Sequence, residues 1–541
     1  MDPRRRPIAL QHALLVGAGL AAGLAIRAAN LGGPAFGYDE LYHVFAAKGL
    51  LDGEGLALPS GRPYTRGALV SLLTAGAFVL FGEHEWSARV PALLFGAASL
   101  VLIYAAGRTL FGPIAGVTAL WLLALSPEAV DADRYARMYS PLTAFGLLAA
   151  LAAYRALEGG GRRWAVVAVA AAAVAVHLHP AALMLVVAVG AYAASCCLAA
   201  ALRGERQPRR HLALALGLLA LAAASALTPP VRSLVREAAA TPLPWYRPEP
   251  GDVLTYHRHL AATYGWLWPL LWPATFVALL TRPRPGLFTA LAFWLQLVIL
   301  SVAVATKHVR YIIHVLPFAW LVLGGAAQSL WPPARDALQA RVRAWVPGRL
   351  AGAAASAAVL VLAVAPLARL MPSVPAAASR PWRTEGAFAT GHFDDWRGLE
   401  RELRPRLDPR ALLVTRVQLA ARYYLGRPAH HLLSAHARRG GGDWEQPSRT
   451  DDDQVQHAGD LARLRRLGAP VWLVVEAWRW EQPGYLDEGL VAAAARDCRP
   501  VPVGAVAFVV FACDPITAVG LAPAADRSAG ERGGTRPERG R

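Results

Sequence analysis

The feature that most restricts the fold of this chain is a series of apolar runs, each nearly long enough to cross a bilayer. Such runs begin at Ile8 and recur as far as Leu370. A transmembrane helix needs about 20 consecutive, mostly apolar residues. Only 17% of the 541 residues are charged, whereas a soluble protein carries about 25%. We therefore predict a polytopic α-helical membrane protein whose membrane domain occupies residues 1–370.

Short arginine-rich loops separate the apolar runs, for example at residues 162–163, 203–210 and 335–349. Cytoplasmic loops carry an excess of Lys and Arg, so we place these loops inside. The net charge of +18 is then explained by arginines in cytoplasmic loops, and we expect no nucleic-acid partner. The pattern predicts about 11 transmembrane helices. They are expected at residues 8–29, 87–106, 113–125, 141–157, 164–176, 181–202, 212–227, 260–280, 287–305, 312–330 and 350–370.

The first outer loop, residues 30–86, contains one further apolar segment at 64–81. We interpret this segment as a helix that lies at the membrane interface. The alternative, a full span, would move several arginine-rich loops to the outside and violate the inner bias of basic residues. The interfacial interpretation is therefore favoured.

The composition changes after about Arg380, where short apolar runs alternate with amphipathic segments. This alternation is typical of a small α/β domain, which we assign to residues 380–515 on the extracytoplasmic side. Residues 516–541 are rich in Gly, Arg, Ser and Pro, and we expect a disordered tail. The expected strands are 411–415, 471–476 and 505–513, and the expected helices are 418–425 and 485–496.

Four cysteines are present. Cys196 and Cys197 lie within an apolar run and are expected to be packing residues. Cys498 and Cys513 lie in the α/β region, and they could form a disulfide if that region faces an oxidising compartment.

Two adjacent acids, Asp39 and Glu40, stand among aromatic residues just after the first apolar run, within Phe36–Tyr42. Carboxylates are costly in hydrocarbon, so acids at the end of a span are candidates for a functional site. A solvated acidic loop that only ends the span remains the alternative. The same outer side receives three other polar groups in this topology: Asp131, Asp133, Arg134 and Arg137; His177 and His179; Lys307, His308, Arg310 and Tyr311.

These residue types suit the transfer of a group from a lipid phosphate. A carboxylate can act as general base toward an acceptor, and Arg or Lys can neutralise the leaving phosphate. Simpler alternatives stay open: Asp133 and Arg134 as a local ion pair, and Lys307 and Arg310 as headgroup anchors. No metal is required, although paired acids could hold a divalent ion.

Four short segments, taken in their order and spacing, carry a family resemblance. They are Tyr38–Asp39–Glu40 with Tyr42, Ser87–Pro91, Leu110–Gly112, and Arg310–Tyr311 before Leu316–Pro317. They resemble the membrane glycosyltransferases that use polyprenyl-phosphate sugars, namely glycosyltransferase family 39 and its relatives, such as protein O-mannosyltransferases and aminoarabinose transferases. The resemblance implies a GT-C fold and an inverting transfer, with Asp39 as base, Asp133 as the second-loop acid and Arg310 near the lipid phosphate.

The chain departs from this family at Tyr64–Gly67. Relatives often have a basic residue followed by two prolines there, and here Arg66 precedes a glycine. The segment Arg134–Tyr139 looks more like the broader bacterial branch than the protein mannosyltransferases. The resemblance therefore leaves the acceptor open.

These observations predict an integral-membrane glycosyltransferase of the inner (plasma) membrane that moves a sugar from a polyprenyl-phosphate carrier to an envelope acceptor. The alternatives are a transporter or flippase for a lipid-linked substrate, or a non-catalytic scaffold. The prediction requires Asp39 and Arg310 to lie together on one side of the bilayer. We assign Asp39, Glu40 and Asp133 to catalysis, Arg66, Arg137, Lys307, Arg310 and Tyr311 to the donor phosphate, and Tyr42, Arg134, His177 and His179 to the rest of the pocket.

Overall fold

The structure is a computed structural model that describes residues 5–205, 209–228, 232, 253–304, 307–345, 395–435, 454–504 and 508–516. It divides into two compact units between Asp394 and Asp395. The expected last span at 350–370 lies outside the described residues, as does the expected tail except for Ile516.

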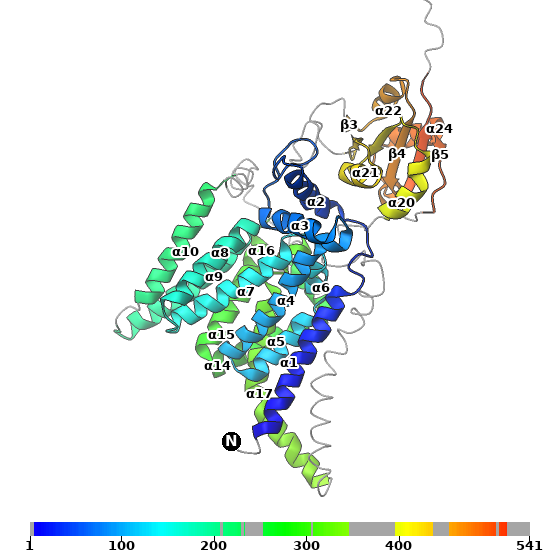
Figure 1. Ribbon diagram of the computed structural model, residues 1–541. Coiled ribbons are helices and arrows are strands. Elements are labelled where there is room, and N and C mark those ends of the chain that lie inside the picture. The colour runs from blue at the N-terminus through cyan, green and yellow to red at the C-terminus, as the bar shows by residue number, and fades with distance from the viewer. Residues whose placement is uncertain are drawn as a thin grey trace, which may run out of the picture. The chain divides into compact units, whose positions relative to one another are not determined.

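The first unit consists of helices (Figure 1). In the described part of the chain, four helices are long and apolar enough to cross a membrane, or five if one bent pair is a single span. A polytopic helical membrane unit agrees with the prediction, whereas the total of about 11 spans stays a prediction. The helices are α1 (Arg5–Ala28), α2 (Tyr38–Leu51), α3 (Ala68–Phe81), α4 (Glu85–Leu110), α5 (Pro113–Ala124), α6 (Pro127–Asp133), α7 (Tyr139–Leu157), α8 (Arg162–Leu178), α9 (Ala182–Leu202), α10 (Arg209–Leu227), α13 (Thr255–Tyr264), α14 (Leu267–Thr281), α15 (Pro283–Ala290), a π-helical segment (Leu291–Leu295), α16 (Gln296–Val302), a 3-10 segment (Val309–Ile312) and α17 (Leu316–Trp345).

Glycines allow α4, α5 and α17 to pack closely in the middle of this unit (Figure 1). A Cβ on Gly107 of α4 would lie 2.8 Å from the Cα of Gly116 in α5, and one on Gly324 of α17 would lie 2.7 Å from the carbonyl oxygen of Ala115. Helices in lipid associate largely through such close backbone contacts. The alanine- and glycine-rich sequence therefore determines which helices form the core.

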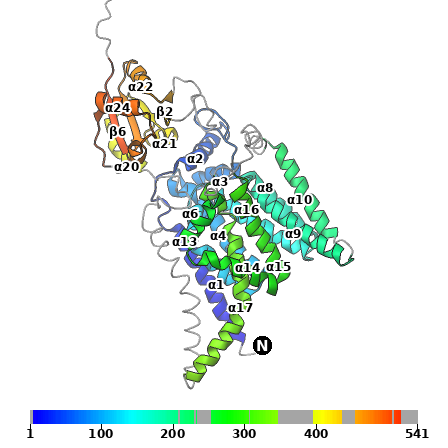
Figure 2. The same cartoon turned by 180° about the vertical axis from the view of Figure 1, so that it is seen from behind.

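Helices α2 and α3 lie at one end of the helical unit in both views (Figures 1 and 2). Helix α3 has only 14 residues, which is shorter than the roughly 20 that span a bilayer. The motif Tyr38–Tyr42, which is expected in the first outer loop, forms the first turn of α2. This helix is buried on all sides, from Glu40 to Ala47 without a break, so its sequence carries no amphipathic periodicity that would have predicted it.

The chain bends sharply after α5. Helices α5 and α6 form a broken pair with an angle of 67° between them. Leu125 and Ser126 separate the two helices, and Pro127 is the first residue of α6, a position where proline suits the start of a helix. The bend turns α6 and the following residues 134–138 toward the end of the unit where α2 begins, as the contacts described below establish.

The second unit is an α/β fold with a six-stranded sheet in the order β3-β2-β1-β4-β6-β5. Strands β3, β2, β1 and β4 run parallel to one another, whereas β6 is antiparallel to both of its neighbours, β4 and β5. Cys498 and Cys513 form a disulfide. The elements are α20 (Trp396–Leu403), a 3-10 turn (Arg404–Arg406), β1 (Leu412–Thr415), α21 (Gln418–Tyr424), β2 (Ala429–Leu432), β3 (Gln454–Val455), α22 (Ala458–Arg465), β4 (Val471–Glu476), α23 (Ala477–Glu481), α24 (Glu488–Asp497), β5 (Arg499–Pro500) and β6 (Phe508–Cys513).

Candidate active site

The carboxylate of Asp39 lies in the first turn of α2 between two arginines that are distant in sequence. Arg310 Nη1 donates to Asp39 Oδ2 at 2.6 Å across 271 positions. Arg137 Nη2 lies 3.4 Å from the same oxygen, and its Nη1 donates to the Asp39 carbonyl at 2.9 Å. The Asp39 side chain is 19% exposed and that of Arg310 20%. The two residues therefore lie together, as the prediction required, and both side chains are partly exposed at the surface of the protein.

The positive charges around Asp39 determine its ionisation. Burial alone would raise the pKa of Asp39, but the guanidiniums of Arg137, Arg310 and Arg66 and the nearby His308 outweigh this effect and hold the pKa below its ordinary value. The helix N-terminus also favours a negative charge there. Asp39 is therefore a carboxylate at neutral pH, and Arg66 is close enough to influence it.

Aromatic rings pack around this ionic cluster. Tyr64 accepts a hydrogen bond from Arg137 Nη1 at 3.2 Å, and its ring stacks on that of Tyr42 with centroids 5.3 Å apart. On the other side, the His179 ring lies 5.9 Å from Tyr139 and 5.7 Å from Tyr311. The predicted pocket residues Tyr42, His179 and Tyr311 therefore lie around the cluster. Tyr64 was not singled out as a site residue in the sequence analysis.

Gly37 explains how α2 can begin so close to this cluster. A Cβ at this position would lie 2.5 Å from the hydroxyl oxygen of Tyr135, so any side chain would push the segment after α6 away. The backbone N–H of Gly37 donates to Glu40 Oε2 at 2.9 Å, which caps the helix start. The glycine of the motif is therefore required by close packing.

The contacts and the burial of Glu40 do not fit its predicted role in catalysis. Arg89 donates to both of its oxygens, at 2.8 and 2.7 Å, and the backbone N–H groups of Gly37 and Ala136 donate to them at 2.9 and 2.8 Å. Both charged side chains are fully buried. A carboxylate with four hydrogen bonds and no exposed surface cannot contact a sugar, so Glu40 holds α2, α4 and the segment after α6 together.

Asp133 is also a structural residue, contrary to its assignment to catalysis. Its Oδ2 accepts from Arg27 Nε at 2.6 Å, and both side chains are buried. Arg27 also donates to the carbonyl oxygens of Gly23, Leu123 and Ala124, so it joins α1 to the end of α5. The alternative interpretation, a local ion pair with Arg134, is not what the structure shows, because Asp133 pairs with Arg27. Arg134 donates to the Ala29 carbonyl at 2.6 Å.

Two further predicted residues point away from the Asp39 cluster. The ammonium group of Lys307 donates to the carbonyl oxygens of Leu300 and Ser301 at 2.8 and 2.7 Å, and also to that of Val304. It therefore caps the C-terminal end of α16. His177 is exposed and binds the Ala173 carbonyl of its own helix, so of the two histidines only His179 lies in the site.

Arg27 and Arg89, which neutralise the buried acids, are not among the site residues predicted from the sequence. Arg27 stands inside the first apolar run, and a charge within a span is itself a signal of a functional or structural partner. Arg89 lies at the start of its helix, where a charge is ordinary, and its one signal was its place in the family-like segment Ser87–Pro91. Among the described residues, no group of three or more His, Cys, Asp or Glu side chains is arranged to hold a metal ion.

Comparison with solved structures identifies the fold. ArnT from Cupriavidus metallidurans in the apo state matches with a TM-score of 0.58 and 17% identity, covering 94% of this chain and 98% of that chain. An oligosaccharyltransferase of Archaeoglobus fulgidus matches with a TM-score of 0.57 and 12% identity, covering 90% of this chain and 73% of that one. The chain has the GT-C fold. At these identities, the structural likeness establishes the fold and no particular reaction.

Sequence matches to this GT-C chain are shorter. The model of the family described as dolichyl-phosphate-mannose-protein mannosyltransferase matches residues 65–227. YkcB of Bacillus subtilis, provisionally named a mannosyltransferase, is 32% identical over 90 residues, which are 17% of this chain and 13% of that protein. YycA of the same organism, also provisionally named so, is 33% identical over 90 residues and the same shares. The matched segment therefore spans only a small part of these relatives.

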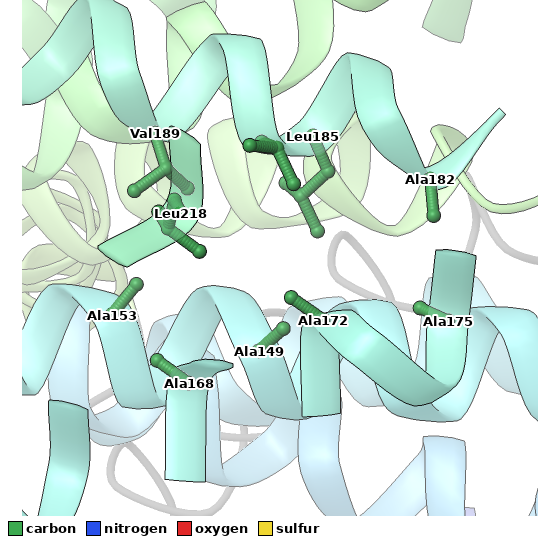
Figure 3. Close-up of a pocket in the computed structure, with 10 residues that line it drawn as sticks. Ala149, Ala153, Ala168, Ala172, Ala175, Ala182, Leu185, Val189 and Leu218 are labelled. Atoms are coloured by element: carbon green, nitrogen blue, oxygen red, sulfur yellow. The ribbon is translucent and has the colours of Figure 1, made fainter. Parts of the chain in front are cut away.

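The GT-C unit also contains an apolar crevice between α7, α8, α9 and α10 (Figure 3). Alanines of α7 and α8 face Leu185 and Val189 of α9 and Leu218 of α10 across it. Its empty volume is about 300 Å³, which includes space open to the surroundings. No polar side chain lines it, so it offers no catalytic group.

Proposed function

We propose that this protein is an integral-membrane glycosyltransferase that moves a sugar from a polyprenyl-phosphate carrier to an acceptor of the cell envelope. The transfer inverts the anomeric centre, and Asp39 is the general base. The observation that carries the proposal is the ionic cluster of Asp39, Arg137 and Arg310, assembled from three distant segments at one end of a GT-C unit. The relatives give support in general terms, since one ArnT structure contains undecaprenyl phosphate.

The chemistry follows from the charges of the cluster. The acceptor hydroxyl attacks the anomeric carbon, its proton passes to the Asp39 carboxylate, and the bond from that carbon to the phosphate oxygen breaks. The electron pair leaves with the polyprenyl phosphate, where guanidiniums stabilise the added negative charge. Arg310, Arg137 and Arg66 supply these cations in the proposal, and Tyr311 and His179 border the sugar.

The arginines that bind Asp39 also suggest how the donor prepares the base. In the absence of donor, Arg310 and Arg137 pair with Asp39. A phosphate group competes for the same guanidiniums, and its arrival weakens their hold on the carboxylate. The pKa of Asp39 then rises, because fewer positive charges act on it, and the carboxylate becomes a stronger base when the donor is present.

The cluster and the α/β unit are proposed to face the extracytoplasmic side of the inner membrane. The arginine-rich loops assign the opposite side to the cytoplasm. The disulfide between Cys498 and Cys513 agrees with an oxidising compartment for the α/β unit. Labelling of the variant Arg162→Cys in intact cells tests this topology. A thiol reagent that does not cross the membrane should leave this cysteine unlabelled if position 162 faces the cytoplasm.

The decisive experiment measures transfer by the purified full-length protein, with labelled polyprenyl-phosphate sugars and envelope extracts as acceptors. We expect transfer by the native protein and a loss of about 10²–10⁴-fold in Asp39→Asn, because general-base catalysis contributes that range. The amide keeps the shape of the side chain but cannot take the proton.

The matched control is Asp52→Asn, because Asp52 is an exposed acid at the other end of the same helix. This variant should transfer at the native rate. Undiminished transfer by folded Asp39→Asn would refute the assignment of the base, and no transfer with any labelled donor would refute the transferase itself.

A further inference from the structure

The α/β unit contains a second polar cluster, at the carboxyl ends of its central strands. The chain passes from β1 to β2 and β3 on one side and then returns to β4 on the other side of β1. In open α/β sheets, ligands bind beyond the carboxyl ends of the strands where the strand order reverses in this way. The residues at this edge, which we call the carboxyl-edge cluster, are Arg416, His431, Glu476 and Arg479.

The register of the sheet places His431 and Glu476 on one face. Thr415 pairs with His431, and Leu413 pairs with Trp472, so positions 415, 431, 474 and 476 share a face. The opposite face carries Val414, Leu432 and Leu473, which belong to the hydrophobic core. Phe508, which pairs with Glu476, packs its ring on Trp396 of α20. The acid and the histidine therefore lie on the face that α20 covers.

The cluster contains buried polar atoms without hydrogen bonds. His431 is 4% exposed and Glu476 1%, and neither the two ring nitrogens of His431 nor the two carboxylate oxygens of Glu476 have a hydrogen-bond partner among the described residues. The same holds for Nε and Nη1 of Arg479, although Nη1 lies 3.0 Å from Glu476 Oε1 as an ion pair. More than about 90% of buried polar groups are normally hydrogen-bonded, so such a concentration points to a missing partner.

The same two arginines, Arg416 and Arg479, act on both buried groups of the cluster. Burial, together with Arg416 and Arg479, lowers the pKa of His431 to about 4. Burial raises the pKa of Glu476 against the opposing effect of the same two arginines. The imidazole is therefore neutral at physiological pH and offers one donor and one acceptor. Arg416 and the side chain of Arg479, which is 16% exposed, form the accessible part.

We propose that the carboxyl-edge cluster binds a sugar that carries an anionic group. Two guanidiniums beside a single acid leave an excess of positive charge, which suits a carboxylate or a phosphate. The buried acid and the neutral imidazole offer partners for hydroxyl groups. The rings of Trp478 and Tyr485 stand beside the Arg479 guanidinium, 4.7 and 5.7 Å from it, and provide apolar surface for a sugar ring.

This site belongs to the α/β unit, whereas the Asp39 cluster belongs to the helical unit, and its ligand needs no transferase activity to bind. The test therefore uses the full-length protein in detergent, both native and with Arg310→Gln. Ligand-observed NMR titrations use glucuronic acid, glucose 6-phosphate, glucose and inorganic phosphate. We expect at least one anionic sugar to bind about tenfold or more tightly than glucose, a difference of about 1.4 kcal/mol. The two anionic sugars distinguish carboxylate from phosphate recognition. Arg310→Gln, which removes a cation from the Asp39 cluster, should bind them as tightly as the native protein does, because the proposed site lies in the α/β unit.

Three variants complete the test. Arg416→Gln, a change at a partly exposed side chain, should weaken the anionic sugar about tenfold and leave thermal unfolding unchanged. Glu476→Gln should weaken the sugars without weakening inorganic phosphate, because it removes a repulsive charge. Arg496→Gln is the matched control, since Arg496 is exposed and pairs with its neighbour Asp497, and it should bind normally. Equal binding by native protein and folded Arg416→Gln, or no binding of any probe, would mean that the cluster holds only water and would overturn the proposal.

Discussion

Asp39 and Glu40 are adjacent acids, yet the protein uses them in opposite ways. Asp39 is partly exposed and shares one oxygen with two arginines from distant segments. Glu40 is fully buried, and both of its oxygens are occupied by Arg89 and by backbone N–H groups. An acid whose hydrogen-bonding capacity is used up inside the protein stabilises the fold, whereas an accessible acid with competing cations can exchange its partners for a substrate.

The same contrast separates the two arginine environments. Arg27 and Arg89 each bind several carbonyl oxygens as well as an acid, so all sides of the guanidinium are engaged within the core. Arg310 makes one short bond to Asp39 and retains exposed surface. The comparison predicts that changes at the buried pairs affect stability and that changes at the exposed cluster affect transfer.

The largest expected effect is on folding, at Glu40. Glu40→Gln leaves the Arg89 charge buried without its counter-ion, and breaking a buried pair in this way costs about 3–5 kcal/mol. A denaturant titration of the protein in detergent measures this loss of unfolding free energy. Glu83→Gln is the matched control, because Glu83 pairs with Lys48 at the surface and such pairs contribute about 0–1 kcal/mol. Equal stability of the two variants would break the comparison.

A large loss of transfer with only a small loss of stability is expected at Arg310. Arg310→Gln removes a cation from the leaving phosphate, and we expect transfer to fall about 10²-fold, as for other lost stabilisers of a developing negative charge. Kinetics with a labelled polyprenyl-phosphate sugar measure this effect. Arg108→Gln, at an exposed position on α4, should transfer normally. If Arg310→Gln unfolds early but the folded fraction transfers at the native rate, Arg310 belongs with the structural arginines.

The titration of Asp39 with pH sharpens the comparison further. Because neighbouring cations hold the pKa of Asp39 below 3.8, the carboxylate stays ionised as the pH falls until that lowered value is reached. Its contribution to stability is likewise present above the unfolded pKa and lost below the folded one. In donor-free protein, titration of Asp39 followed by NMR or infrared spectroscopy should therefore fall below 3.8, and Arg310→Gln should move it upward. A titration near the ordinary carboxyl value in both proteins would contradict the cluster.

The sequence predicted most of the helices but not the roles of the acids. Apolar runs gave the bounds of α7 and α9 to within a few residues, because burial in lipid requires length and hydropathy alone. The division of labour between Asp39 and Glu40 depends on where Arg89, Arg137 and Arg310 arrive, and no local pattern contains that information. His177 and His179 show the same limit, since Leu178 ends the helix between them and only one faces the site.

In the α/β unit, the strands that could be predicted are those with a continuous apolar run. Strands β1, β4 and β6 were expected from their apolar runs, because their side chains are covered by helices or by neighbouring strands. Strand β2 contains two histidines, and β3 and β5 have two residues each, so none of these three carries a clear strand pattern. The buried His431 belongs to this unpredicted part of the sheet, and for this reason the carboxyl-edge cluster could not be predicted from the sequence.

The smallest expected effect is at Lys307. Its ammonium group binds the last carbonyl oxygens of α16, and a cation at a helix C-terminus contributes about 0.3–1 kcal/mol. Lys307→Met should therefore lower the unfolding free energy slightly and leave the KM for the donor unchanged. Lys307→Arg should restore the stability. A large increase in the KM for the donor in Lys307→Met would contradict this expectation. It would mean that Lys307 leaves the helix end when the donor binds. The division between structural and substrate-binding cations would then fail at this residue.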